Sequence, residues 1–460
     1  MGIESEGSVI ERSANRARLA LAGALLAGVV GCAAPSEDRE TSTRVTTERE
    51  GLRHMNEIAE AYVRLVLDVG QHDGDYVDAY YGPAEWRAEA EEQTRALEAI
   101  DSDAAGLEGR LANIDPDSFE ERAQLRHRYL TVQIGSMRAR IAMLGGRRFT
   151  FDEESEALYD AVAPTHDEAH FQAILDELDR LIPGTGDLST RYATFQEAFV
   201  IPPDRLDAVF RAAIDECRKR TLERTELPAD ENFEIEYVKG KSWSAYNWYK
   251  GRSYSLIQVN EDLPIAIDRA IDLACHEGYP GHHVYNALLE KTLVRGLGWV
   301  EYSVYPLFSP QSLIAEGTAN YGIDLAFPGD DRVEFERDVL FPLAGLDPSS
   351  ADLFYRVWGL TKKLSYAGNE AARRYLNGTI DAEEAVAWLM RFALMPEGLA
   401  ERRVRFYDQY RSYVINYNLG QDRVAEYIER KVGPEGTQAD RWTAFLELLS
   451  SPRLPSGLLE

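Results

Sequence analysis

The stretch EDLPIAIDRAIDLACHEGYPGHH, residues 261–283, combines a helical pattern with an abrupt break and ends in a cluster of histidines. Its apolar residues recur at three- and four-residue intervals, which predicts a helix with one face directed inwards. Asp262 is the expected N-cap, and Pro264 is expected in the first turn. The helix should break at Pro280-Gly281, because proline lacks an amide hydrogen and glycine tolerates a non-helical backbone.

The histidines of this stretch have the spacing of an altered zinc site. In the zinc-peptidase signature H-E-x-x-H, the second histidine follows the first by four residues on one helical face. Here His282 and His283 follow His276 by six and seven residues. A two-residue bulge at the Pro-Gly pair would restore the four-residue phase for His282. His282 is therefore the favoured second ligand and His283 the alternative, while a histidine-rich helix end without metal is the competing interpretation.

A second helix offers a third ligand. SLIAEGTANYGIDLAF, residues 312–327, predicts a helix with Glu316, Asn320 and Asp324 on one line. A glutamate among apolar neighbours is costly to bury unless it is paired. In peptidases of the gluzincin type, a glutamate from a second helix completes the zinc site, so Glu316 is the expected third ligand of one zinc ion. Asn320 and Asp324 would orient the histidines. The alternative is a solvated helix face.

Glu277 directly follows the first histidine and is the expected general base. Adjacent helical positions point about 100° apart, so Glu277 cannot duplicate the direction of His276, but it can reach a water on the metal. A zinc ion with three protein ligands keeps one position open for water and polarises a peptide carbonyl. Glu277 would take the proton of that water and pass it to the leaving amine. Tyr417 and Tyr254 are the candidate donors to the tetrahedral intermediate, although such tyrosines are more often core residues.

The rest of the chain predicts helices and one small sheet. Helical periodicity marks several segments before the motif, namely 51–70, 84–113, 119–144, 167–181 and 203–226. Residues 232–260 are aromatic and β-branched and predict a small antiparallel β-meander before the metal-site helix. Within it, 252–260 is the candidate edge strand for an extended substrate, and a hairpin that merely covers the core is the alternative. The expected fold is mainly α, a multi-helix single domain over residues 51–460.

The beginning of the chain has the pattern of a targeting segment. Three arginines precede an apolar run of thirteen residues, which is too short to span a bilayer. The run ends in VVGC, which resembles a bacterial lipobox, so residues 1–31 are expected to be a lipoprotein signal peptide and Cys32 the lipidated N-terminus. Residues 32–50 are polar and predict a flexible tether. Ala33 provides no Asp-type retention signal, which favours lipid anchoring in the outer membrane of the cell envelope, facing the periplasm.

Charge and cysteine content narrow the classes of partner. The formal net charge is −28, with 78 acidic and 50 basic residues. Such a chain repels nucleic acid and anionic lipid surfaces, so no nucleic-acid partner is expected and membrane attachment would come from acyl chains. After cleavage before Cys32, only Cys217 and Cys275 would remain. They are predicted to be buried thiols without a disulfide framework.

The motifs HEGYPGHH and AEGTANYG resemble the pair H-E-x-x-P-G-H-H and E-G-W-A-x-Y of a bacterial family, the domain-of-unknown-function 885 family. That family looks similar in fold to the carboxypeptidase Taq family of zinc peptidases. Further blocks extend the likeness over most of the chain, namely DAYYGPAEW at 78–86, NWYKGRSYSLIQVN at 247–260 and YRSYVINYNLG at 410–420.

The resemblance implies a mostly α fold with a deep central groove and zinc-dependent peptidase activity. His276 and His282 would bind the metal with Glu316 as the third ligand, and Glu277 would be the general base. The chain departs from the family in lacking the tryptophan after Gly317 and the P-G-Q before the final Tyr-x-x-Gly. Its substrate pocket is therefore expected to differ from that of the family more than its metal site does.

Two other functions are compatible with the same features. The first is a catalytically inactive helical envelope lipoprotein that binds peptides, and metal content together with hydrolysis would separate it from a peptidase. The second is a zinc amidase that acts on cell-wall fragments, which a panel of substrates would separate. Peptide is the expected substrate in the favoured interpretation.

Overall fold

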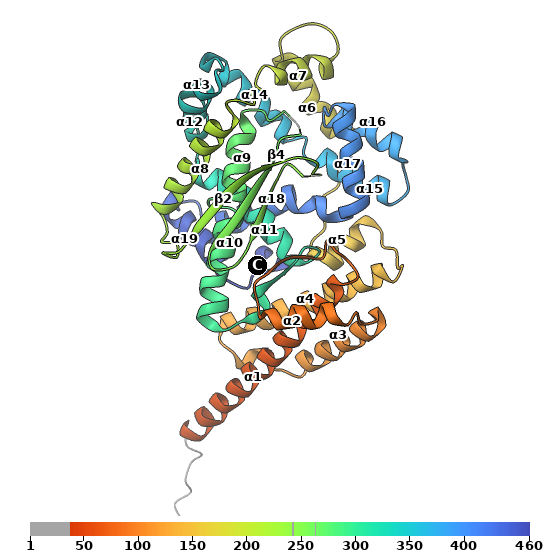
Figure 1. Ribbon diagram of the computed structural model, residues 1–460, viewed down its shortest axis with the longest axis vertical. Helices are drawn as coiled ribbons and strands as arrows, with labels where there is room; N and C mark the ends of the chain where they lie inside the picture. Colours follow the sequence, from red (N-terminus) through yellow and green to blue (C-terminus); the bar gives the residue numbers. More distant parts are fainter. Residues whose placement is uncertain (1–36, 242, 263) are drawn as a thin grey trace, which may run out of the picture. The chain divides into compact units, whose positions relative to one another are not determined.

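The computed structural model describes residues 37–460 apart from 242 and 263, and helices dominate it (Figure 1), as the sequence predicts. Residues 47–460 form one compact unit. The predicted signal peptide, residues 1–31, and the predicted lipidation site Cys32 lie outside the described residues. In the part of the chain that is described, no helix combines the length and the apolar character needed to cross a membrane.

Helix α1 (Glu37–Gly70) begins inside the segment predicted to be a flexible tether. The backbone of 37–50 is helical, and the role of 32–50 as a tether stays a prediction. This segment contains neither proline nor glycine, and it leads directly into a periodic helical sequence. Helix propagation from an existing turn adds one hydrogen bond for each residue that is fixed, so a polar segment without a breaker can extend a helix.

The predicted helical segments before the sheet are helical, and additional helices lie between them. In chain order these are α2 (Ala84–Glu92), α3 (Leu97–Ala112), α4 (Glu121–Leu144), α5 (Phe151–Tyr159), α6 (Glu168–Leu181), α7 (Leu188–Glu197) and α8 (Leu206–Leu222). The segment 84–113, predicted as one helix, is divided because the backbone of Gln93 is extended. Tertiary contacts hold the break, since Arg95 pairs with Asp68 at 2.9 Å and with Asp103 at 2.5 Å.

The remaining helices follow the sheet. They are α9 (Asp268–Glu277), α10 (His282–Leu289), α11 (Pro310–Ala326), α12 (Asp331–Phe335), α13 (Phe341–Ala344), α14 (Ala351–Lys362), α15 (Tyr366–Leu376), α16 (Ala382–Phe392), α17 (Glu397–Tyr410), α18 (Ile415–Val432) and α19 (Gln438–Leu449). Helix α9 starts later than predicted, and Asp262 is not its N-cap. The Asp262 carboxylate instead accepts hydrogen bonds from the amides of Gly240 and Lys241, at 2.6 and 3.3 Å.

The sheet before α9 is mixed, so the predicted antiparallel meander is wrong in its topology. It contains β2 (Asn232–Val238), β3 (Ala245–Tyr249) and β4 (Tyr254–Asn260), in the spatial order β2-β4-β3. Strand β3 pairs with β4 in antiparallel orientation, whereas β2 pairs with β4 in parallel. A tight turn joins β3 to β4, and Gly251, Arg252 and Ser253 all have positive φ there. In this hairpin β4 lies between β3 and the preceding strand β2. The sheet packs on α9 and α10.

A second sheet was not predicted. Strand β1 (Val77–Tyr80) pairs in antiparallel orientation with β5 (Val304–Pro306), and the amide of Tyr81 extends the pairing by donating to Ser303 O at 2.9 Å. These strands are too short to produce a recognisable alternation in the sequence. Their pairing brings the N-terminal segment around Asp78 next to the start of α11.

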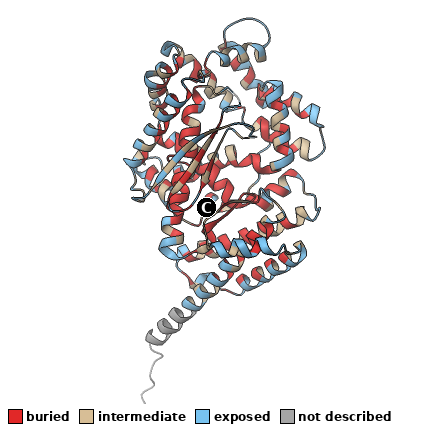
Figure 2. Ribbon diagram, viewed as in Figure 1, coloured by how far each residue is buried: buried red, intermediate tan, exposed pale blue. Residues whose placement is uncertain are grey.

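Helix α11 lies in the buried centre of the unit (Figure 2) and packs closely on α18. The two helices cross at Gly317 and Gly420. A Cβ on Gly317 would lie 2.4 Å from Gly420 O, so any larger residue would force the helices apart. Glu316 is 6% exposed, and the alternative of a solvated helix face is therefore wrong at this position.

Cys217 of α8 and Cys275 of α9 form a disulfide, which corrects the prediction of two unpaired thiols. The cysteines are 58 residues apart in the sequence, and no local pattern indicates their pairing. The packing of α8 on α9 places their Cα atoms 5.6 Å apart, within the range that a disulfide needs. The bond fixes α9 one residue before His276.

Candidate metal centre

The break between α9 and α10 folds the chain back on itself. The amide of Gly281 donates to Cys275 O at 3.0 Å, and a Cβ at position 281 would lie only 1.8 Å from His276 O. Glycine is thus required for this close approach. The imidazole rings of His276 and His282 end 4.6 Å apart and are perpendicular to each other. The helix break thereby brings His276 and His282 together, as the six-residue spacing with a bulge at Pro280-Gly281 predicted.

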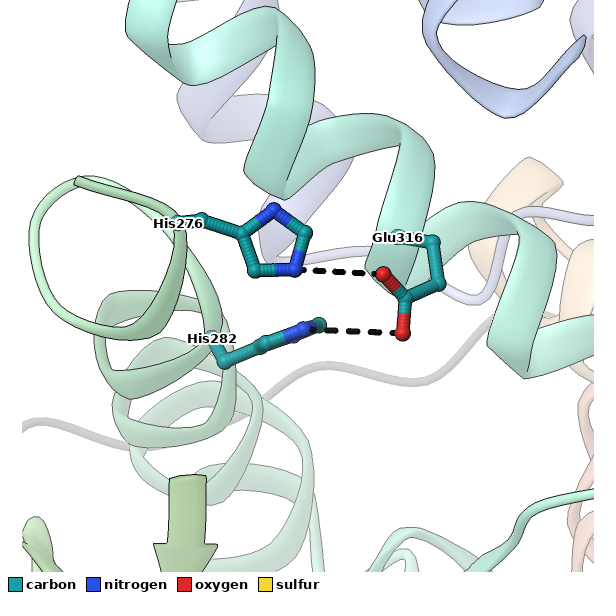
Figure 3. A group of neighbouring side chains, drawn as sticks. All are labelled: His276, His282 and Glu316. Atoms are coloured by element: carbon teal, nitrogen blue, oxygen red, sulfur yellow. Dashed lines mark ion pairs between the residues drawn. The ribbon is translucent and has the colours of Figure 1, made fainter. Parts of the chain in front are cut away.

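Three side chains from three helices converge on one point (Figure 3). His276 Nε2 lies 3.2 Å from Glu316 Oε2, and His282 Nε2 lies 3.7 Å from Glu316 Oε1. Tetrahedral zinc with ligand bonds near 2.0–2.1 Å separates its ligand atoms by about 3.3–3.4 Å. Glu316 Oε2 is also buried without a hydrogen bond from any described residue. The separations, the donor types and this unsatisfied oxygen fit a two-histidine, one-glutamate zinc site.

Neighbouring residues fix the orientation of this trio. Asn320 Oδ1 lies 2.9 Å from His276 Nδ1, so Nδ1 carries the hydrogen and Nε2 is left to face Glu316. Tyr413, in the short 3-10 segment Arg411–Val414, donates its hydroxyl hydrogen to Glu316 Oε1 at 2.8 Å. The expectation that Asn320 orients a histidine is confirmed.

Asp324 does not share that role, and the prediction for it is wrong. Its carboxylate accepts from Gln421 Nε2 at 2.6 Å and lies 3.6 Å from Lys362 Nζ. Asp324 is one helical turn beyond Asn320 and is exposed, so the line of polar residues on α11 runs out of the buried site.

The protonation preferences of the trio follow from burial and from Glu316. Burial lowers the pKa of His282 to about 4, so this imidazole is neutral. Burial also lowers the pKa of His276, but the Glu316 carboxylate outweighs this effect and raises it to about 9. Burial raises the pKa of Glu316, yet His282 and His276 bring it below the ordinary value. Glu316 is therefore anionic, and metal binding would displace a proton from His276.

His283, the alternative ligand, lies in a different environment. Its Nδ1 is 2.8 Å from Ser255 Oγ, and its Nε2 is 3.0 Å from Glu231 Oε1. Glu231 also accepts hydrogen bonds from Tyr279 and from Arg218. The Ser-His-Glu chain has the order of a catalytic triad, but Ser255 and His283 are both fully buried. A group without access to substrate cannot act as a nucleophile, so this chain joins β4 to α10.

Glu277 lies in the same cavity as the trio. Its main-chain oxygen accepts from Asn247 Nδ2 at 2.6 Å, which ties the end of α9 to β3. Burial raises the pKa of the Glu277 carboxyl to about 7, and Glu316 adds to the shift while His276 opposes it. The carboxyl thus changes charge near neutral pH, as a general base requires.

The two candidate tyrosines have different positions. Tyr417 lines the cavity, where burial raises the pKa of its hydroxyl and the charges of Glu316 and Glu277 raise it further. Tyr254 begins β4 and is not among the described residues that line the cavity. Of these two tyrosines, Tyr417 is the one that lines the cavity beside the trio.

The cavity that contains these groups has a volume of about 1120 Å³. Its wall includes the edge strand β3 and the residues before it, Trp243, Ser244, Ala245, Tyr246 and Asn247. The prediction of 252–260 as an edge strand was wrong, because β4 is the middle strand, whereas β3, which lines the cavity, is at an edge of the sheet. The predicted groove is present as this cavity.

Sequence reasoning missed Asp78 and Tyr413 as cavity residues. Asp78 of β1 accepts a hydrogen bond from the Tyr246 hydroxyl, and burial, with Glu316 and Glu277, raises its pKa to about 8. The block DAYYGPAEW contains Asp78, and YRSYVINYNLG contains Tyr413. These two blocks were the available signal, but neither one indicates which side chain enters the cavity.

No family model matches the sequence, and no curated protein matches it. Among solved structures, the chain is similar to a "putative lipoprotein" from Colwellia psychrerythraea, with TM-score 0.48 and 13% identity over 79% of this chain and 68% of that one. It is also similar to a "putative lipoprotein of unknown function" from Shewanella oneidensis, with TM-score 0.44 and 12% identity over 93% of each chain. An M32 carboxypeptidase from Deinococcus radiodurans R1 matches with TM-score 0.35 and 14% identity, over 88% of this chain and 90% of that one. All these TM-scores are below 0.5, so the case for a function depends on the site itself and the family resemblance stays a prediction.

Proposed function

We propose that this protein is a zinc-dependent peptidase, anchored in the cell envelope through lipid on Cys32. The observation that carries the proposal is the convergence of His276, His282 and Glu316 beside Glu277 in one large cavity. A His₂Glu set is a donor set of catalytic zinc sites, because three protein ligands leave one coordination position open. The cavity volume of about 1120 Å³ is sufficient for several residues of a peptide.

When bound, a zinc ion would supply a Lewis acid that lowers the pKa of a water and polarises the peptide carbonyl. Glu277 would accept the proton of the attacking water and donate it to the leaving amine. The position of Glu277, one residue after a ligand on the last turn of α9, aims it into the cavity beside the trio. Asn320 and Tyr413 would hold the ligand side chains in place during this proton transfer.

Two further elements would position the substrate. Strand β3 has an unpaired edge at the cavity wall and could pair with the main chain of an extended peptide. The hydroxyl of Tyr413 is committed to Glu316, which leaves Tyr417 as the candidate donor to the carbonyl oxygen in the transition state.

The deciding experiment compares wild type with Glu277→Gln at matched zinc occupancy on a peptide library. Glutamine keeps the shape of the side chain but cannot take a proton, so hydrolysis should fall by roughly 10²–10⁴-fold with zinc content unchanged. Zinc should be present at about one ion per chain. Equal turnover by the two proteins would contradict the mechanism. If neither protein turns over peptides, the function is a peptide-binding lipoprotein or, if cell-wall fragments are cleaved, an amidase.

A further inference from the structure

One wall of the cavity carries two arginines without an acidic partner. Arg402 and Arg403 lie on α17, line the cavity and are half-buried. Within residues 37–460 as described, neither side chain makes an ion pair or a hydrogen bond, and the Arg403 guanidinium lies 5.3 Å from the centre of the Phe406 ring. Arg405 of the same helix differs from them, because it is exposed and pairs with Glu401 at 4.0 Å.

Other arginines of the cavity wall are neutralised. Arg269 pairs with Asp272 at 3.2 Å, and Arg332 pairs with the same carboxylate at 2.8 Å. The chain has 78 acidic and 50 basic residues, so acids are not scarce. A half-buried guanidinium loses part of its hydration, and without a counter-ion this loss is not compensated. The α17 wall therefore favours an anion in the cavity.

Apolar side chains flank the two cations on the same helix face. Leu399, Arg402, Arg403 and Phe406 all line the cavity. Their spacing of three, four and seven residues places them on one stripe of α17. Leu399 is 40% exposed, so its side chain offers apolar surface at the wall of the cavity. The stripe combines a site for an anion with a surface for an apolar group.

This wall belongs to the same electrostatic environment as the candidate metal centre. Burial raises the pKa of the Tyr417 hydroxyl and Glu316 raises it further, while Arg403 acts in the opposite direction. Arg402 and Arg403 line the same cavity as the trio, so one peptide in that cavity could contact both.

We propose that Arg402 and Arg403 bind a carboxylate of the peptide substrate, so that the cavity selects peptides bearing this group. The inference rests on the proposed peptidase function and adds the substrate class to it. Guanidinium groups form charge-assisted hydrogen bonds with carboxylates, and these bonds are stronger than those between neutral groups. The carboxylate can come from the C-terminus of the peptide or from an acidic side chain.

Binding measurements on zinc-loaded Glu277→Gln protein test the proposal without hydrolysis. The probes are fluorescein-labelled tetrapeptide libraries with either a free carboxylate or an amide at the C-terminus, each prepared with and without an internal aspartate. Binding by fluorescence anisotropy should favour the free carboxylate about 10- to 100-fold. Adding R402Q and R403Q should abolish the preference, whereas the matched control R405Q should keep it. Circular dichroism and zinc content verify that each variant is folded.

The outcomes separate the source of the carboxylate from the existence of the site. A preference that follows the internal aspartate, and is lost with R402Q and R403Q, assigns the site to an acidic side chain and supports the proposal. Equal binding of probes with and without a carboxylate overturns it, as does a preference that survives the double substitution or the failure of every probe to bind.

Failure of the proposed peptidase activity remains distinguishable from failure of this site. If the arginine-dependent preference is present but wild type hydrolyses no peptide, the carboxylate site stands and the peptidase function is wrong. If wild type hydrolyses peptides equally well with any carboxylate (C-terminal or side-chain) and with none, the peptidase function stands and the carboxylate site is wrong.

Discussion

His282 and His283 are neighbours in the chain, and each of them faces a buried glutamate, yet their surroundings are opposite. His282 approaches Glu316 at the wall of a cavity, where one carboxylate oxygen accepts no hydrogen bond from any described residue. His283 approaches Glu231 in the fully buried contact between the sheet and α10, and both of its ring nitrogens have partners. Unsatisfied bonding capacity beside a cavity indicates a ligand site, whereas complete pairing in a closed space indicates a structural contact.

The largest expected effect concerns zinc content. His282→Ala should reduce bound zinc from about one ion per chain to nearly none, because two remaining ligands cannot hold the metal. His283→Ala should retain it. Metal analysis of both purified variants checks this difference, and full zinc in His282→Ala with loss in His283→Ala would reverse the assignment of the two histidines.

Stability should show the opposite order. His283→Ala removes hydrogen bonds from buried Ser255 and Glu231 and leaves a cavity, so it should lower the free energy of unfolding by about 2–4 kcal/mol. The His282 side chain lines a cavity, so His282→Ala should change the free energy of unfolding by less than about 1 kcal/mol. Urea unfolding of the zinc-free proteins measures both values. Equal destabilisation by the two substitutions would remove the distinction between the sites.

Asn320→Ala should weaken zinc binding without removing it. The substitution deletes the oxygen that orients His276 but keeps all three ligand groups. Loss of such a partner typically costs about 10- to 100-fold in metal affinity. Competition with a chromophoric chelator provides the measurement, with Asp324→Ala as the matched control on the same helix line. An Asp324→Ala loss as large as that of Asn320→Ala would contradict the placement of these residues.

The smallest effect is a pH dependence of stability that originates in the buried Glu231. Burial raises the pKa of Glu231, but hydrogen bonds from His283, Tyr279 and Arg218 outweigh it and lower the value from 4.5 to about 2. The folded state therefore favours the ionised form, so this contribution is complete above pH 4.5 and is lost as the pH falls towards about 2. Glu231→Gln should therefore reduce the loss in the free energy of unfolding between pH 4.5 and about pH 2. Denaturant unfolding at several pH values measures this loss, and an unchanged loss in the variant would show that other carboxyls cause it.

Much of the helical fold is predictable because helices depend on local spacing. The apolar intervals of α4, α6 and α8, and the Pro280-Gly281 break after α9, follow from side chains a few residues apart. The pairing of β2 with β4, the β1-β5 sheet and the Cys217–Cys275 disulfide join segments that are distant in the sequence. No periodicity of one segment specifies its distant partner, and for this reason these features were missed or wrong.

The same division applies to the candidate site. The sequence by itself determined the residue types, the altered histidine spacing and the presence of a glutamate in an apolar helix, which together led to His276, His282, Glu277 and Glu316. The sequence favoured His282 over His283 as the partner of Glu316, but only the tertiary structure decided that His283 faces Glu231. It also decided that Tyr413 holds Glu316 and that β3, not β4, is the edge strand. The physical reason is that the packing of whole elements determines which side chains meet. Adjacent residues of one helix point in different directions, so His282 lines the cavity while His283 lies in the closed core.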